Sequence, residues 1–93
     1  MKKEICNFIL KNSKLLEGVE EDNNIIIYVL DLDKYDEETD SFYRVIDYKG
    51  IKKVAQYLVE KCETFYPQGY STMVFDFEDF KVFLPDCTTR DIF

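Results

Sequence analysis

The clearest pattern in this chain is a helical periodicity between Gly50 and Pro67. Apolar residues recur there every three or four positions, which places them on one face of an α-helix. They are Ile51, Val54, Ala55, Leu58, Cys62 and Phe65. Pro67 and Gly69 end the pattern, because proline lacks the N–H that a helix needs. We therefore predict an amphipathic helix over residues 51–65.

The N-terminal segment has a similar spacing. Ile5, Phe8, Ile9 and Leu16 fall at i, i+3, i+4 and i+11, which favours a second amphipathic helix. Gly18 follows this stripe and is the residue type that most often provides a left-handed helix C-cap. The sequence therefore predicts that the first helix ends near Gly18.

Four segments have the composition or alternation of β-strands. Residues 24–33 are rich in β-branched side chains, and residues 41–48 alternate between the two faces of a strand. We expect them to form a hairpin through an acidic loop at 34–40. Residues 71–77 and 80–84 predict a second hairpin that turns through Glu78 and Asp79, and Pro85 ends its last strand.

The order of these elements predicts the fold class. The chain of 93 residues has room for one core, so residues 1–93 are expected to form a single small acidic domain. The order α-β-β-α-β-β predicts an α+β two-layer sandwich, with a four-stranded, mainly antiparallel sheet and two helices on one face. The tail at 86–93 carries Ile92 and Phe93, so we expect it to dock on the domain or on a partner.

The outer face of such a sheet is expected to be apolar. If Ile26, Tyr28, Leu30 and Leu32 face the helices, then Ile25, Ile27 and Val29 lie on the outer face together with Val74. The chain also contains seven tyrosines and eight phenylalanines, residues that are favoured at interfaces. The sequence therefore predicts either a homodimer or a partner on this face, with a crowded core as the alternative.

Negative charge is concentrated in residues 17–40. Ten of these 24 residues are carboxylates, with Lys34 as the one basic residue among them, whereas the whole chain has a net charge of −7. The carboxylates are Glu17, Glu20, Glu21, Asp22, Asp31, Asp33, Asp36, Glu37, Glu38 and Asp40. A solubilising surface is the ordinary interpretation of such a block, and attraction to a basic partner is the functional one.

The sequence disfavours catalysis, cofactors and direct binding of nucleic acid. Histidine, the usual group for proton transfer near neutral pH, is absent, and the three glycines are isolated. The acidic block fails as a calcium loop, because Asp36 and Phe42 stand where that loop needs Gly and Glu. Three widely spaced cysteines predict reduced thiols in a cytoplasmic protein, and neither a metal site nor a membrane anchor is expected.

These observations favour a non-enzymatic module that binds a basic surface of another protein. Its size, its acidity and its ten lysines against two arginines suit a phage or mobile-element inhibitor that mimics DNA and blocks a nucleic-acid-binding effector. Anti-CRISPR proteins and uracil-DNA glycosylase inhibitors are analogies of class only. An antitoxin or immunity-type protein and a housekeeping homodimer are the alternatives. The predicted partner-binding residues are Glu20, Glu21, Asp22, Asp31, Asp33, Tyr35, Asp36, Glu37, Glu38, Asp40, Phe42 and Tyr43.

Overall fold

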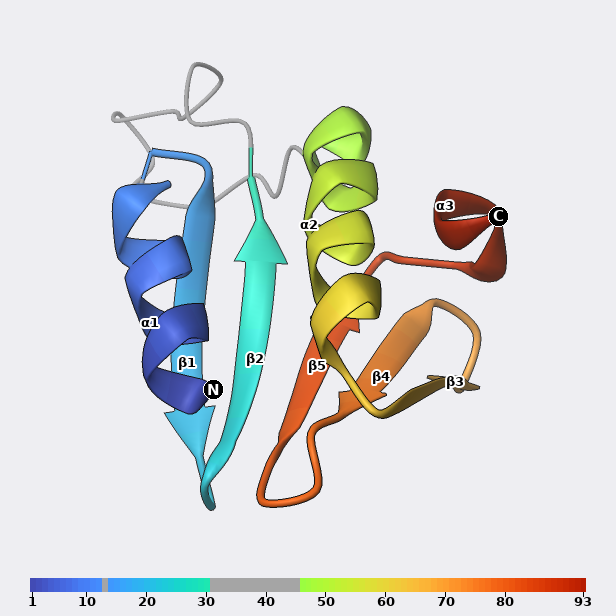
Figure 1. Cartoon of the computed structure of the whole chain (residues 1–93). Helices are drawn as coiled ribbons and strands as arrows, with labels where there is room; N and C mark the ends of the chain where they lie inside the picture. The colour runs from blue at the N-terminus through green and yellow to red at the C-terminus, as the bar shows by residue number, and fades with distance from the viewer. Residues whose placement is uncertain (13, 31–45) are drawn as a thin grey trace.

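Five strands form one mixed sheet within residues 1–12, 14–30 and 46–93, the residues that this computed structural model describes. The strands are β1 (Leu16–Glu21), β2 (Asn24–Val29), β3 (Thr64–Gln68), β4 (Thr72–Asp76) and β5 (Lys81–Pro85). Their order in the sheet is β1-β2-β5-β4-β3 (Figure 1). Adjacent strands are antiparallel except β2 and β5, which run parallel and join the two antiparallel parts.

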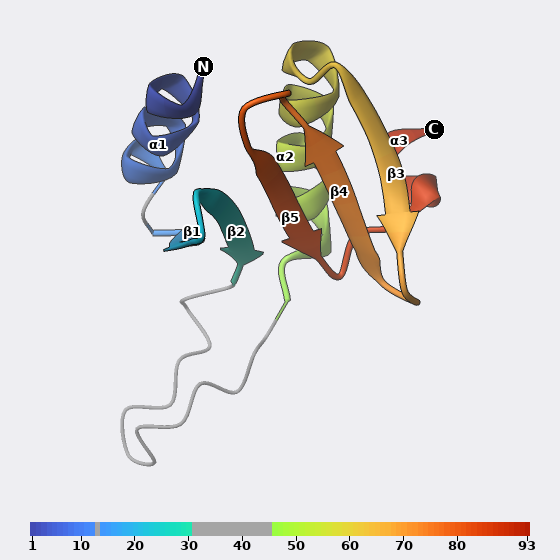
Figure 2. The same cartoon turned by 90° about the horizontal axis from the view of Figure 1, so that it is seen from below.

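The helices lie on one face of this sheet, as Figure 2 shows for α1 and α2. They are α1 (Lys2–Lys11), α2 (Tyr48–Lys61) and the short α3 (Thr89–Ile92). Among the described residues, none of these helices has the length and apolarity needed to cross a membrane. The arrangement is an α+β fold with a helical layer over a sheet.

The core lies between α2 and the middle of the sheet. Leu58 of α2 and Phe75 of β4 are completely buried, and so is Val82 of β5. Ile5 brings α1 into the same cluster over β1 and β2. Because each fully buried apolar side chain contributes ~1.5–3 kcal/mol, this cluster supplies the main stabilisation of the fold.

The α+β class is as predicted, but the sheet differs in detail from the prediction. Strands β1 and β3 were not expected, and the parallel pairing of β2 with β5 makes the sheet mixed. Most of the predicted strand at 41–48 lies outside the described residues. Ile46 forms an isolated antiparallel bridge with Leu30, and α2 begins at Tyr48. The hairpin predicted from 71–77 and 80–84 is confirmed as β4 and β5.

Both predicted helices end earlier than their apolar patterns. The first ends at Lys11, and Gly18 is a strand residue in β1 and not a helix cap. The second ends at Lys61, and Phe65 belongs to β3, where it pairs with Phe75. In each case the last apolar residue of the predicted stripe belongs to a strand, where Leu16 is buried and Phe65 packs, partly buried, against the same core.

The predicted faces of β2 were reversed. Ile25, Ile27 and Val29 are buried under the helices, whereas Ile26 and Tyr28 lie on the outer face and are partly exposed. A run of apolar residues has no alternation that distinguishes its two faces, so the sequence left this choice open.

The C-terminal tail docks on the domain, one of the two outcomes expected for it. The side-chain Nε2 of Gln56 in α2 donates hydrogen bonds to the carbonyl oxygens of Asp91 (3.4 Å) and Ile92 (3.1 Å). Ile92 packs against the core cluster. Asp91 also accepts a hydrogen bond of 2.9 Å from the N–H of Thr88, so a capping box begins α3.

Candidate functional site

The turn between β1 and β2 has positive φ at both of its residues. The angle is 49° at Asp22 and 68° at Asn23, as a type I′ hairpin turn requires. Asp and Asn tolerate these angles because their short side chains hydrogen-bond the local backbone. The turn closes on the pair Glu21–Asn24. It therefore places the carboxylates of Glu21 and Asp22 at one end of the sheet.

A second turn, between β4 and β5, lies beside the first. The side-chain Nδ2 of Asn23 donates a hydrogen bond of 3.0 Å to the carbonyl oxygen of Asp79. The backbone N–H of Lys81 donates one of 3.0 Å to Oδ1 of Asn24. Both contacts depend on the parallel pairing of β2 and β5, which makes these strands begin at the same end. Figure 1 shows the two turns side by side at the lower end of the sheet.

The second turn brings further carboxylates to this end. Oδ1 of Asp76 accepts a hydrogen bond of 2.9 Å from the N–H of Glu78. The N–H of Glu63, just before β3, donates one of 2.9 Å to the carbonyl oxygen of Asp76. The charge of Glu78 is the main cause of a raised pKa at Glu63, and Asp76 and Asp79 act in the same direction. These carboxylates are therefore close enough to repel one another.

We call this region the acidic end, and two lysines interact with its carboxylates. Lys2 forms an ion pair with Glu20 and donates a hydrogen bond of 2.6 Å to Oδ1 of Asn23. Lys81 pairs across the strands with Asp76, and a hydrogen bond with Tyr66 raises its pKa, so it stays charged. Among the described residues, Lys2 and Lys81 are thus the cations that pair with carboxylates of this region. The acidic end is defined by Glu20, Glu21, Asp22, Glu63, Asp76, Glu78 and Asp79.

The structure unites part of the predicted site with residues that were not predicted. Glu20, Glu21 and Asp22 lie together at the acidic end. The other predicted site residues lie outside the described residues: Asp31, Asp33, Tyr35, Asp36, Glu37, Glu38, Asp40, Phe42 and Tyr43. The bridge between Leu30 and Ile46, which flanks that segment, is at the opposite end of β2 from the Asp22 turn.

Sequence reasoning missed four members of the acidic end, namely Glu63, Asp76, Glu78 and Asp79. The turn at Glu78 and Asp79 was predicted correctly. Its proximity to Asp22 was not, because that requires knowing that β2 pairs with β5. β2 and β5 are each the second strand of a hairpin. When two such strands pair in parallel, the turns that precede them lie at the same end of the sheet.

The outer face of the sheet carries one apolar row that crosses all five described strands. Its members are cross-strand partners in sequence: Val19, Ile26, Phe83, Val74 and Tyr66. Val74 at the centre is fully buried by its neighbours, whereas Val19 and Tyr66 at the two edges are 39% and 38% exposed. The row is therefore apolar throughout and accessible at its ends.

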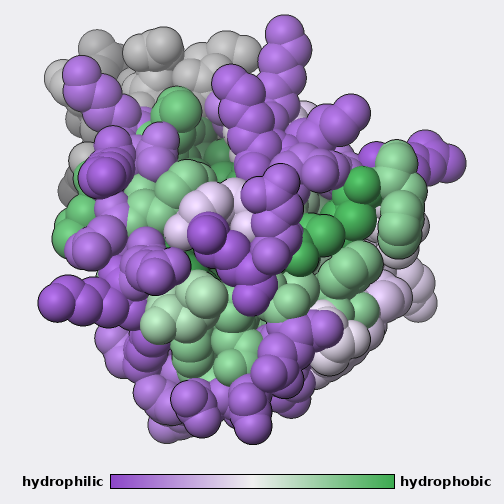
Figure 3. All heavy atoms as spheres, in the orientation of Figure 1, coloured by the Kyte–Doolittle hydropathy of each residue, from purple (hydrophilic) through white to green (hydrophobic). Residues whose placement is uncertain are grey.

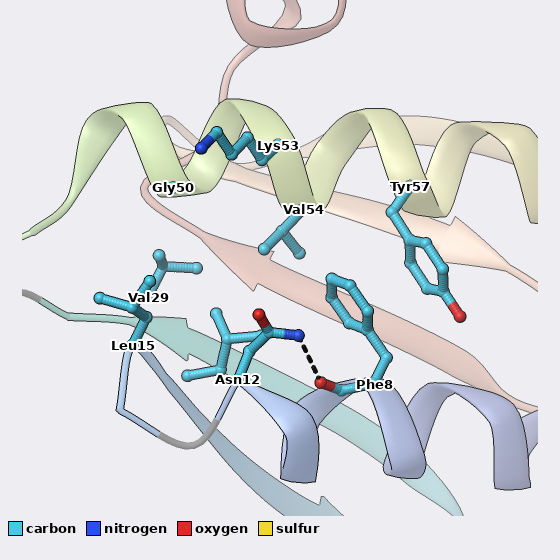
Figure 4. Close-up of a pocket in the computed structure, with 9 residues that line it drawn as sticks. Phe8, Asn12, Leu15, Val29, Gly50, Lys53, Val54 and Tyr57 are labelled. Atoms are coloured by element: carbon cyan, nitrogen blue, oxygen red, sulfur yellow. Dashed lines mark hydrogen bonds between the residues drawn. The ribbon is translucent and has the colours of Figure 1, made fainter.

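A groove separates α1 from α2 on the helical face (Figure 4). Its volume is about 190 Å³, and Phe8 stacks on Tyr57 across it with ring centroids 4.0 Å apart. The amide of Asn12 donates a 2.8 Å hydrogen bond to the carbonyl oxygen of Phe8, so it stabilises the end of α1. Figure 3 shows hydrophobic side chains exposed among hydrophilic ones on this face. The groove is suited to apolar contact.

The thiols are held in their protonated form where the structure perturbs them. Burial raises the pKa of Cys87 to about 12, and desolvation also raises the pKa of Cys62. A thiol must lose its proton to act as a nucleophile, so Cys87 is unreactive at neutral pH.

Comparison with known proteins gives no relative from which a function could be transferred. Neither family models, nor curated proteins, nor solved structures match the chain. Within the described part of the chain, no group of three or more His, Cys, Asp or Glu side chains is arranged to hold a metal ion.

Proposed function

We propose that this protein is a non-enzymatic module that binds a basic surface of a partner protein through its acidic end. The observation that carries the proposal is the hydrogen bond from Asn23 to Asp79, because it joins two acidic turns into one surface. Repulsion among carboxylates costs stability, as the raised pKa of Glu63 indicates. An opposite charge on a partner would relieve this repulsion.

Electrostatic attraction gives such a surface a specific role in association. A field from exposed carboxylates extends about one Debye length, ~8 Å at physiological salt. It can raise association rates ~10- to 1,000-fold for a partner of opposite charge. The deepest basic grooves belong to proteins that bind nucleic acids, so we propose that the module occupies such a groove in place of the phosphate backbone. In this role it would act as an inhibitor of phage or mobile-element type.

The test is to remove the charge while keeping the turns. The quadruple variant Glu21→Gln, Asp22→Asn, Glu78→Gln and Asp79→Asn preserves side-chain size and hydrogen bonding. The control variant Glu4→Gln, Asp47→Asn, Glu60→Gln and Asp86→Asn changes the net charge equally at other places. Titration calorimetry with polylysine over a range of salt concentrations should show a loss of about tenfold in affinity for the first variant. Equal losses in both variants would mean that net charge alone governs binding, against this proposal.

The idea of nucleic-acid mimicry needs its own measurement. A partner retained by the immobilised protein from a bacterial lysate should be released by salt and also by duplex DNA, because both ligands would use one groove. Release by salt but not by DNA would reject mimicry. It would indicate a basic partner that does not bind DNA at the same surface, as expected for an antitoxin or immunity-type protein.

A homodimer is the second candidate, and the apolar row on the outer face favours it. Pairing of two such faces would cover Val19, Ile26 and Phe83 in each copy. Light scattering on the wild type and on Phe83→Lys would distinguish a dimer that this row holds together from a monomer at all concentrations.

A further inference from the structure

Strand β1 forms an open edge of the sheet. Among the described strands, β2 is its one neighbour, and every β1 residue after Leu16 is exposed. The N–H of Leu30 donates a hydrogen bond of 2.8 Å to the carbonyl oxygen of Leu15, so the odd-numbered residues of β1 form the hydrogen bonds to β2. The N–H and C=O groups of Gly18 and Glu20 consequently point away from the sheet.

The opposite edge, β3, is built differently. Pro67 lies within β3 and has no N–H to offer to another strand. Tyr66 contacts Lys81 in a cation–π geometry, with Nζ 5.9 Å from the ring centroid. Proline on an edge strand is a common protection against strand addition. Strand β1 lacks proline, so its protection depends on charge alone.

The two sides of β1 offer different contacts to an added strand. Glu17, Val19 and Glu21 project on the outer side, so Val19 ends the apolar row between two carboxylates. On the helical side Gly18 has no side chain. A hollow of about 220 Å³ lies there, between β1 and α1, and the 70% exposed Leu10 of α1 lines it.

We propose that the β1 edge binds an extended, basic segment of the partner protein as an added antiparallel strand. This inference rests on the proposed function and names the form of the ligand. The segment would carry Lys or Arg opposite Glu17 and Glu21, which are separated by ~13 Å along the strand. It would carry a β-branched residue opposite Val19, to extend the apolar row, and an aliphatic residue opposite Gly18, to fill the hollow.

A second copy of the chain does not fit this edge. Pairing of β1 with β1 of another copy would bring Glu17, Glu20 and Glu21 close to the same residues of that copy. Like charges on directly opposed strands are destabilising, whereas a basic segment satisfies both the backbone and the charge. The occupant is therefore a different protein.

The probe is the peptide acetyl-Thr-Lys-Thr-Val-Leu-Lys-Thr-amide, written so that its two lysines lie opposite Glu21 and Glu17. The Thr that follows the first Lys would then lie opposite Glu20, and the Leu opposite Gly18. Both of these residues would donate their backbone N–H groups to β1. Methylation of these two backbone nitrogens should lower affinity about tenfold, since each hydrogen bond contributes modestly. The matched control is methylation of the backbone nitrogens of Val and of the second Lys, because those N–H groups point away from β1.

A matched pair of protein variants tests the same backbone hydrogen bonds from β1. Glu20→Pro removes an outward N–H, whereas Glu20→Ala keeps it, and both remove the carboxylate that pairs with Lys2. The proline variant should bind the peptide about tenfold more weakly than the alanine variant. Circular dichroism would show that both are folded. Leu10→Ser should weaken binding of the Leu-containing peptide but not of one with Ala in its place.

The outcomes separate this inference from the proposed function. Equal binding of the two methylated peptides, or of the Pro and Ala variants, would overturn strand addition and leave recognition by charge intact. Replacement of both peptide lysines by Glu should abolish binding, and retained binding would overturn both proposals. The parent peptide must also bind at millimolar concentration and shift the amide NMR signals of residues 17–21, and failure of either would overturn strand addition.

Discussion

The two long helices cover the same face of the sheet but contribute differently to the fold. Helix α2 buries five residues over the centre of the sheet, and the side chain of Asp47 caps its N-terminus. Helix α1 has Ile5 as its fully buried residue, lies over the edge strand β1, and begins without a side-chain cap. Stability is therefore centred on α2, whereas the β1 edge proposed for strand addition lies under the less anchored helix.

Truncation of a buried side chain in each helix should give the largest difference in stability between α2 and α1. Leu58→Ala is expected to cost ~3–5 kcal/mol, because the rigid centre of the sheet cannot close the cavity. Ile5→Ala, which also truncates a completely buried residue, should cost ~2–3 kcal/mol, since α1 can move towards β1. Urea denaturation would give both values. Equal losses would show that α1 is held as firmly as α2.

Glycine-to-alanine changes compare how closely each helix packs on the sheet. A Cβ at Gly50 of α2 would lie 2.8 Å from both Cγ1 of Val29 and Oδ2 of Asp47. A Cβ at Gly18 of β1 would lie 3.0 Å from Cδ1 of Ile9, the mobile end of a longer side chain.

Gly50→Ala should therefore destabilise the protein by ~1–3 kcal/mol, as overpacking does. Gly18→Ala should change stability by less than ~1 kcal/mol, because Ile9 can adjust and alanine restricts the unfolded chain. Melting temperatures of both variants test the comparison. A larger loss of stability in Gly18→Ala than in Gly50→Ala would show that α1, and not α2, packs more rigidly on the sheet.

Local patterns were sufficient to predict α2 and the hairpin of β4 and β5, but not strands β1 and β3 or the arrangement of the sheet. The helix that contains Leu58 and the turn at Glu78 follow from periodicity and turn chemistry. Strand β1 contains Gly18 and three glutamates, which are poor strand formers. It forms a strand because the Asp22–Asn23 turn pairs it with β2, and such tertiary pairing cannot be read from β1 itself.

The candidate site was predictable only where it is continuous in sequence. Glu20 to Asp22 were identified from the charge of their own segment. Glu63 and Glu78 join them through the parallel pairing of β2 with β5, which forms between segments more than 50 residues apart. Charge counted along a chain cannot show that kind of cluster.

The capping interaction of α2 should contribute a smaller amount of stability than its core. Oδ1 of Asp47 accepts a hydrogen bond of 3.0 Å from the N–H of Gly50. Asp47→Ala should cost ~1 kcal/mol, and Asp47→Asn should cost less, because asparagine is also a good N-cap. Chemical denaturation would measure both. If alanine and asparagine have equal effects, the cap is not what distinguishes α2 from α1.

The smallest effect is expected at the acidic end, where Glu63→Gln should stabilise the protein at neutral pH. The neighbouring charge of Glu78 raises the pKa of Glu63 above its ordinary value of 4.5. A carboxyl group with a raised pKa in the folded state favours folding below its unfolded pKa, and this contribution is lost as the pH rises through the folded pKa. Glutamine is uncharged throughout, so the variant avoids the repulsion at pH 7.

The pH dependence gives this prediction its control. The variant should melt higher than the wild type at pH 7, and the difference should disappear below about pH 4, where Glu63 is protonated in both the folded and the unfolded states. Glu60→Gln makes the same change of net charge on α2 and serves as the matched control. A difference that stays constant from pH 4 to pH 7 would mean that Glu78 does not act on Glu63. The acidic turns would then lack the mutual repulsion that a basic partner is proposed to relieve.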